Sequence, residues 1–171
     1  GAWHPLANGL PDDVYCLAVY DDGSGAALYA GGAFTSAGGV PANFIAKWDG
    51  FNWSPLGSGL DAIPLALATF DDGAGAALYV GGAFRHAGGV PAPHLAKWNG
   101  ATWSTVGVQA GGMGDGFVHA LVAFDDGSGP ALYAGGSFRS AGNTASSLVA
   151  KLSCSGVFTS FCAGDGSLTD H

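Results

Sequence analysis

One stretch of this sequence occurs three times, and this repetition constrains the fold more than any other feature. It reads ALYAGGAFTSAGGVPANFIAKWDG from Ala27 to Gly50 and ALYVGGAFRHAGGVPAPHLAKWNG from Ala77 to Gly100. A looser copy, ALYAGGSFRSAGNTASSLVAKLSC, runs from Ala131 to Cys154. A single copy has no second layer against which to bury its apolar residues, so the copies must pack on one another. The sequence therefore predicts a repeat protein.

The spacing of the copies divides the chain into units. The second copy follows the first at 50 residues (Ala27 to Ala77), whereas the third follows the second at 54 (Ala77 to Ala131). The additional residues fall near positions 109–116. We expect units at about 8–57, 58–107 and 108–161, with residues 1–7 as the fourth strand of a preceding unit. The repeats end near residue 154, and residues 155–171 are expected to hold the last strand and a C-terminal tail.

Four short apolar runs separated by turn signals make up each unit, which is the pattern of consecutive antiparallel strands. In the first unit they begin at Val14, Ala27, Phe44 and Asn52. The Asp49-Gly50 pair predicts a two-residue type I′ turn between the third and fourth strands. The first run is almost continuously apolar in every unit, which predicts a strand covered on both faces. We expect no helix, because the chain has 31 glycines and no glutamate.

Antiparallel four-stranded units of about 50 residues, stacked face to face, are the blades of a β-propeller. The predicted fold class is therefore all-β, with three propeller blades and one leading strand in this chain. Three blades form only a partial ring, since propellers have about four to eight. A partial ring exposes two apolar blade faces. We expect further blades, from a longer protein or from identical chains, to complete the ring.

In the first two units the second predicted strand ends in a glycine pair. Two tryptophans follow further along the chain, in AKWDGFNW and in AKWNGATW. This arrangement resembles the kelch-type repeat and the propeller of galactose-oxidase-like proteins. The phrase GGAFxxAGGVPAxxxAKWxG is also similar to repeats of secreted bacterial proteins, over residues 1 to about 154. Kelch repeats usually place tyrosine where Trp48 and Trp98 stand, so the units are kelch-like. The resemblance implies a secreted or cell-surface protein. It does not imply galactose oxidase activity, because no copper ligands match.

The charge balance bears on the class of partner. The formal net charge is -8, and every acidic residue is an aspartate. Such a chain repels phosphate backbones and anionic lipid surfaces, so we expect neither nucleic acid nor a membrane as partner. No run of about 18 apolar residues is present to form a transmembrane helix.

Three cysteines have different expected roles. Cys16 lies in an apolar strand and is interpreted as a small buried hydrophobic residue rather than a reactive thiol. Cys154 and Cys162 are candidates for a short disulfide loop if the protein lies outside the reducing cytosol. The alternative is two free thiols.

Alternating strand directions place the loops between first and second strands at one end of the units. This end carries an acidic rim of Asp21, Asp22, Asp49, Asp71, Asp72, Asp125 and Asp126. Paired carboxylates could coordinate calcium, but these loops lack the interleaved acidic pattern of calcium loops. We interpret the aspartates as turn formers and expect no cofactor. Lys47, Lys97 and Lys151 recur at one position, so each is expected to lay its stem on the strand and pair with a nearby aspartate.

The opposite end carries the departures from the repeat. Arg85, His86 and His94 stand where the first unit has Thr35, Ser36 and Phe44. Loops at one end of a rigid scaffold are where binding sites are usually built. The candidate ligand-binding residues are Arg85, His86, His94, Gln109, Met113, Asp115 and Arg139, and drift on exposed loops is the alternative.

No catalytic constellation emerges from the sequence. Two histidines eight positions apart, without a carboxylate or cysteine partner at a recognised spacing, are a poor zinc site. We predict a non-catalytic extracellular propeller module for protein or glycan binding, structural assembly or both. The alternative is a piece of a larger propeller enzyme whose catalytic residues lie outside this chain.

Overall fold

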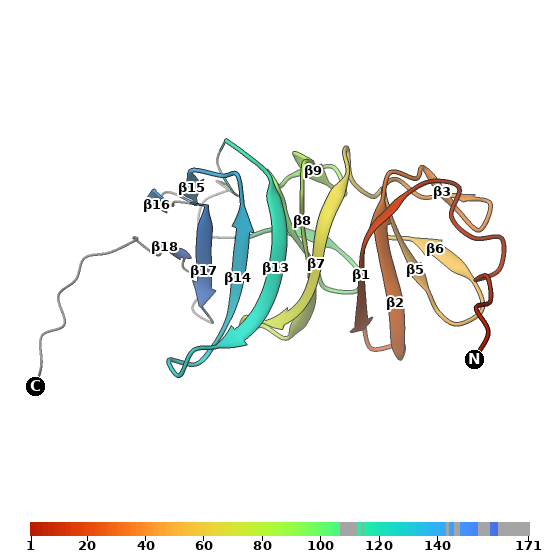
Figure 1. Ribbon diagram of the computed structural model, residues 1–171, viewed down its shortest axis with the longest axis horizontal. Coiled ribbons are helices and arrows are strands. Elements are labelled where there is room, and N and C mark those ends of the chain that lie inside the picture. The colour runs from red at the N-terminus through yellow and green to blue at the C-terminus, as the bar shows by residue number, and fades with distance from the viewer. Residues whose placement is uncertain (107–112, 114, 143, 146–147, 154–157, 161–171) are drawn as a thin grey trace, which may run out of the picture.

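The computed structural model describes residues 1–106, 113, 115–142, 144–145, 148–153 and 158–160 (Figure 1). Every regular element in these residues is a β-strand, so the all-β prediction is confirmed for them. The strands form three antiparallel four-stranded sheets, called units 1, 2 and 3. None of the described residues lies in a helix that could cross a membrane.

The three units share one strand order, in which the second strand pairs with the first and the third. Unit 1 contains β1 (Val14–Asp21), β2 (Ala26–Gly32), β5 (Ile45–Trp48) and β6 (Trp53–Pro55). Unit 2 contains β7 (Pro64–Asp71), β8 (Ala76–Gly82), β11 (Leu95–Trp98) and β12 (Trp103–Thr105). Unit 3 contains β13 (Val118–Asp125), β14 (Pro130–Gly136), β17 (Val149–Ser153) and β18 (Phe158–Ser160).

A small hairpin follows the second strand of each unit. The pairs are β3 (Ser36–Ala37) with β4 (Val40–Pro41), β9 (His86–Ala87) with β10 (Val90–Pro91), and β15 (Ser140–Ala141) with β16 (Thr144–Ala145). Gly88 and Gly89 join β9 to β10 with φ of 60° and 82°. Positive φ at both central residues is what a type I′ turn requires, so the glycine pair forms this turn.

The predicted two-residue turn at Asp49-Gly50 is wrong, although the hairpin itself is present. Trp48 pairs with Trp53, so residues 49–52 connect β5 and β6. The Asp49 Oδ1 accepts hydrogen bonds from the backbone N–H groups of Phe51 (2.8 Å) and Asn52 (2.7 Å). The aspartate therefore closes a longer loop through its side chain.

The core lies between units as well as within them. Tyr20, Tyr29 and Ile45 of unit 1 pack in one buried cluster with Leu78 and Val80 of unit 2. A second cluster joins units 2 and 3 in the same way. The copies bury their apolar residues on one another, as the repetition predicts.

Glycine pairs at the ends of the second strands allow this close packing. A Cβ on Gly81 would lie 2.4 Å from the Val118 Cγ1 of unit 3. A Cβ on Gly31 would lie 2.7 Å from the Pro64 Cγ of unit 2. Glycine is therefore required where the next unit approaches the backbone.

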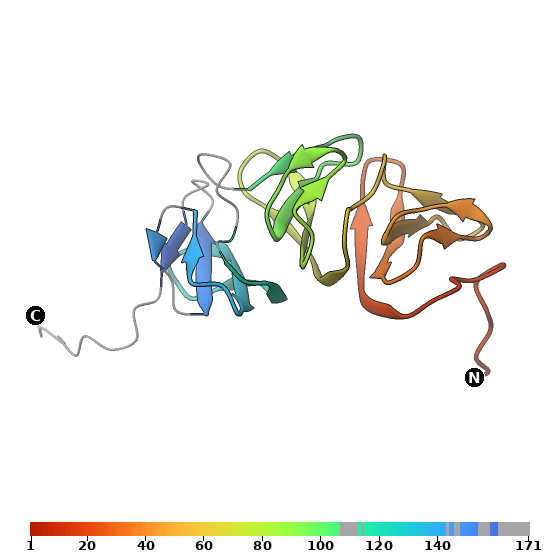
Figure 2. The same ribbon diagram turned by 90° about the horizontal axis from the view of Figure 1, so that it is seen from above.

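First strands of neighbouring units lie side by side, and the other strands of each sheet extend outward from them (Figure 2). The prediction that each first strand is covered on both faces is wrong for β1 and β13, whereas the expectation that three units leave two apolar faces exposed agrees with the structure. Leu17 and Val19 are exposed on β1, and Val122 and Phe124 are exposed on β13. These side chains point away from unit 2, because β1 and β13 each have a neighbouring unit on one side only.

Candidate functional site

The loops that carry the candidate residues lie at two opposite ends of the sheets (Figure 1). The acidic end holds the β1–β2, β7–β8 and β13–β14 loops with their paired aspartates. The hairpin end holds β3–β4, β9–β10 and β15–β16. The turn after β11 lies at the acidic end, since a Cβ on Gly100 would lie 2.7 Å from the Asp22 Cβ.

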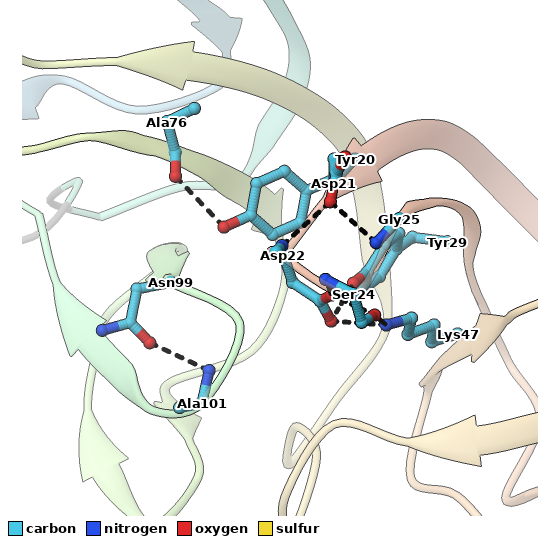
Figure 3. A network of polar contacts seen from close by, with 11 residues as sticks. Tyr20, Asp21, Asp22, Ser24, Gly25, Tyr29, Lys47, Ala76, Asn99 and Ala101 are labelled. Carbon is cyan, nitrogen blue, oxygen red and sulfur yellow. Dashed lines mark hydrogen bonds and ion pairs between the residues drawn. The ribbon is translucent and has the colours of Figure 1, made fainter.

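At the acidic end, the Asp21-Asp22 pair organises its own loop (Figure 3). The Asp21 Oδ1 accepts hydrogen bonds from the backbone N–H groups of Gly23 (2.9 Å) and Gly25 (3.0 Å). The Asp22 Oδ2 accepts hydrogen bonds from the Tyr29 hydroxyl (3.1 Å) and the Lys47 ammonium. The interpretation of these aspartates as turn formers is confirmed.

Units 2 and 3 repeat the aspartate, tyrosine and lysine network. The Lys97 Nζ lies 2.7 Å from the Asp72 Oδ2, and the Lys151 Nζ lies 2.7 Å from the Asp126 Oδ2. The Tyr79 hydroxyl donates to Asp72 (2.8 Å). The predicted pairing of all three lysines is therefore confirmed.

Ionisation of the acidic end follows from these contacts. Burial disfavours the Asp72 carboxylate, but hydrogen bonds from Lys97, Tyr79 and the Ala74 N–H outweigh burial and lower the pKa of Asp72. The pKa of Tyr29 is raised by burial and by the charge of Asp22. Asp72 thus stays charged, and Tyr29 stays protonated and able to donate its hydrogen bond to Asp22. Both states suit a fixed structural contact. No group of three or more metal-ligating side chains occurs among the described residues.

At the hairpin end, Asp61 binds two of the candidate residues. The Asp61 Oδ1 accepts hydrogen bonds from the backbone N–H groups of Arg85 (2.8 Å) and His86 (3.0 Å). The Asp61 Oδ2 lies 2.8 Å from the His86 Nδ1. Asp61 fixes the start of β9 and the His86 ring while both side chains remain about half exposed.

Sequence reasoning missed Asp61, although a signal was present. Asp61 replaces Pro11 of the first unit, a departure of the same kind as Arg85 replacing Thr35. Asp115 lies 54 residues after Asp61, and Arg139 lies 54 residues after Arg85, so the aspartate and the arginine recur together in the third unit.

Two candidates, His94 and Met113, lie beneath the surface. His94 is 3% exposed and packs its ring 5.5 Å from that of Phe117. Its φ of 64° matches the 64° of Phe44 and the 70° of Leu148, so the fold sets this backbone conformation in every unit. The pKa of His94 is lowered, chiefly by burial, and its Nδ1 has no hydrogen-bond partner. Met113 is fully buried, and its N–H donates to the Pro93 carbonyl.

The remaining candidates are at the surface or outside the described residues. Arg85, Arg139 and Asp115 are exposed. Neither arginine takes part in an ion pair with any carboxylate of the described chain. Gln109, Cys154 and Cys162 lie outside the described residues.

Cys16 lies on the first strand of unit 1, where it pairs with Gly31. Its thiol donates to the Gly31 carbonyl across 3.7 Å, and burial raises the pKa of Cys16 to about 12. The thiolate is therefore disfavoured, in agreement with the interpretation of Cys16 as a small hydrophobic residue.

Comparison of the chain with protein-family models, curated proteins and solved structures finds no match. The site is therefore interpreted from its own chemistry.

Proposed function

We propose that the chain is a non-catalytic β-propeller module, secreted or at the cell surface, that binds a protein or glycan ligand through its hairpin end. The three sheets are its blades, of the kelch-like type. Support comes from the common strand order, from the adjacent first strands and from the other strands that extend outward from them (Figure 2). Sheets arranged radially around their first strands are the architecture of a propeller.

The distribution of positive charge carries the binding proposal. All three lysines are held by aspartates at the acidic end, in a contact that every unit repeats. The chain has two arginines, Arg85 and Arg139, and both are exposed at the hairpin end. A guanidinium presents several donors in a rigid plane that matches carboxylates and neighbouring hydroxyls. Ligand contact is assigned to these arginines because neither forms an ion pair within the described part of the chain.

Asp61 and His86 complete the surface that we assign to the ligand. Asp61 holds the backbone at Arg85 and orients the ring of His86. A ligand that contacts Arg85 and His86 therefore meets hydrogen-bonding groups that Asp61 already holds in place. Binding sites gain specificity when such groups are oriented before the ligand arrives.

No catalytic residue is part of the proposal. Asp22, Asp72 and Asp126 each accept hydrogen bonds from a tyrosine and a lysine of the same unit. A contact that recurs in all three units serves the fold of each unit, so we assign these groups to structure.

A binding screen against glycans and purified extracellular proteins tests the proposal. We expect Arg85→Ala combined with Arg139→Ala to weaken the strongest hit at least about tenfold, since hydrogen bonds to charged groups contribute about 1.5–3 kcal/mol each. Ser36→Ala, at the position of His86 in unit 1, is the matched control and should retain full affinity. Unchanged binding by the arginine variant, or an equal loss in the control, would overturn the assignment.

A further inference from the structure

An apolar groove is open on the side of unit 1 that faces away from unit 2. Its volume is about 360 Å³, and it is lined mainly by Leu6, Leu10, Leu17, Leu28, Ala30 and Trp53. The residues 50 positions further on (Leu56, Leu60, Leu67, Leu78, Val80 and Trp103) form the same surface on unit 2. There the surface is covered, because these residues pack in the cluster that joins units 1 and 2.

The structure shows twice what covers this surface. In the contact between units 1 and 2, the covering side chains include Tyr20, Tyr29 and Ile45 of unit 1. In the contact between units 2 and 3, the equivalent side chains of unit 2 take their place, namely Phe70, Tyr79 and Leu95. An aromatic residue on the first strand, a tyrosine on the second and an aliphatic residue on the third thus fill the groove each time.

Unit 3 presents the same three positions on its outer face. They are Phe124, which is 58% exposed, Tyr133, and Val149, which is 42% exposed. The rings of Phe124 and Tyr133 lie 5.9 Å apart, close to the 5.6 Å of Tyr20 and Tyr29. The aromatic pair is therefore already arranged as in the unit that covers a groove.

We propose that the outer face of unit 3 in one copy of this chain docks into the groove of unit 1 in a second copy, and that two copies close into one ring. This inference rests on the proposed propeller. Such a head-to-tail contact is heterologous, so it forms either a closed ring or an open filament. The described residues of each copy form three units. Two copies supply six, within the range of about four to eight that propellers use, whereas three copies would supply nine.

Side-chain chemistry supports the match between the two faces. The Tyr20 hydroxyl of unit 1 donates to the Ala76 carbonyl of unit 2 (3.1 Å), and this position is Phe70 in the contact with unit 3. Phenylalanine is therefore accepted at the first-strand position. Because Phe124 has no hydroxyl group, it can enter the groove without a hydrogen-bond acceptor there.

Sedimentation velocity of the full chain over a range of concentrations tests the proposal. We expect a species of about 34 kDa, which is twice 16.9 kDa. Leu17→Asp in the groove and Phe124→Asp on the outer face should each weaken dimerisation at least about 30-fold, because each buries an unpaired carboxylate. Val90→Asp is the control, because Val90 is 37% exposed on β10 of unit 2 and unit 2 carries neither of the two outer faces.

Mixing the two variants gives a result specific to the head-to-tail geometry. Each variant retains one intact face, so the mixture should form a hetero-dimer that neither variant forms alone. A monomeric wild-type chain, a species larger than two copies, or a dimer that survives both substitutions would overturn the proposal. Because Arg85 and Arg139 lie at the hairpin end, ligand binding by a monomeric chain would leave the proposed function standing while the ring fails.

Discussion

The joint between units 1 and 2 can be tested at Gly88, in the turn of the β9–β10 hairpin. A Cβ at this position would lie 2.4 Å from the Trp103 Cδ1. The indole cannot move away freely, because its Nε1 donates to the Leu56 carbonyl (2.9 Å) and its ring packs 5.2 Å from that of Trp98. Gly88→Ala should therefore displace the tryptophan and loosen the joint.

The magnitude follows from two effects that matched variants separate. Gly89 also has positive φ, but nothing lies within 4 Å of its added Cβ, so Gly89→Ala isolates the backbone effect. Left-handed backbone costs about 1–2 kcal/mol for alanine. Overpacking adds about 1–3 kcal/mol, which gives about 2–5 kcal/mol in total for Gly88→Ala. Gly38→Ala should fall between them, because its Cβ would lie 3.1 Å from the Trp53 Cδ1.

Urea unfolding followed by circular dichroism measures the three free energies. We expect Gly89→Ala to be the least destabilising, Gly38→Ala to be intermediate and Gly88→Ala to be the most destabilising. If Gly88→Ala were no less stable than Gly89→Ala, the tryptophan would not be held at the joint and the reasoning would be refuted.

Two further predictions concern the acidic end and the buried thiol. Lys97→Met should lower the free energy of unfolding by about 1–2 kcal/mol at pH 7, since it removes the ion pair with Asp72. The pKa of Asp72 is lower in the folded chain than its usual value of about 3.9, so this stabilisation is present above about pH 4 and is lost as the pH falls below it. Urea unfolding at pH 7 and pH 3 should show the difference between wild type and variant shrinking, and a constant difference would contradict the assignment. Cys16, whose pKa burial raises to about 12, should resist iodoacetamide at pH 8 in the folded chain and react in 6 M urea, as peptide mapping would show.

The features that the sequence predicts well are those that each unit contains in itself. The strand pattern and the turn-forming aspartates depend on neighbours within one repeat. Lys47 could be assigned to an aspartate because its repetition at Lys97 and Lys151 points to a contact that every unit makes, and Asp22 is that partner.

Features that depend on the neighbouring unit were beyond local reasoning. Leu17 reads as a core residue, yet it is exposed because no unit covers that face of β1. Met113 reads as a loop residue, yet it is buried where its N–H meets Pro93 of the preceding unit. The sequence predicts a type I′ turn at Asp49-Gly50, because Asp-Gly is a frequent hairpin signal, but in unit 1 the two-residue turn with positive φ at both positions is Gly38-Gly39.

The aspartate, tyrosine and lysine network has a consequence for how such a chain changes in evolution. Asp22 meets Tyr29 and Lys47 of its own unit, and Asp72 likewise meets Tyr79 and Lys97. Duplication or deletion of one 50-residue segment therefore leaves no ammonium without its carboxylate. The number of segments can change by simple gene rearrangement at no electrostatic penalty, and only the apolar faces limit which numbers survive.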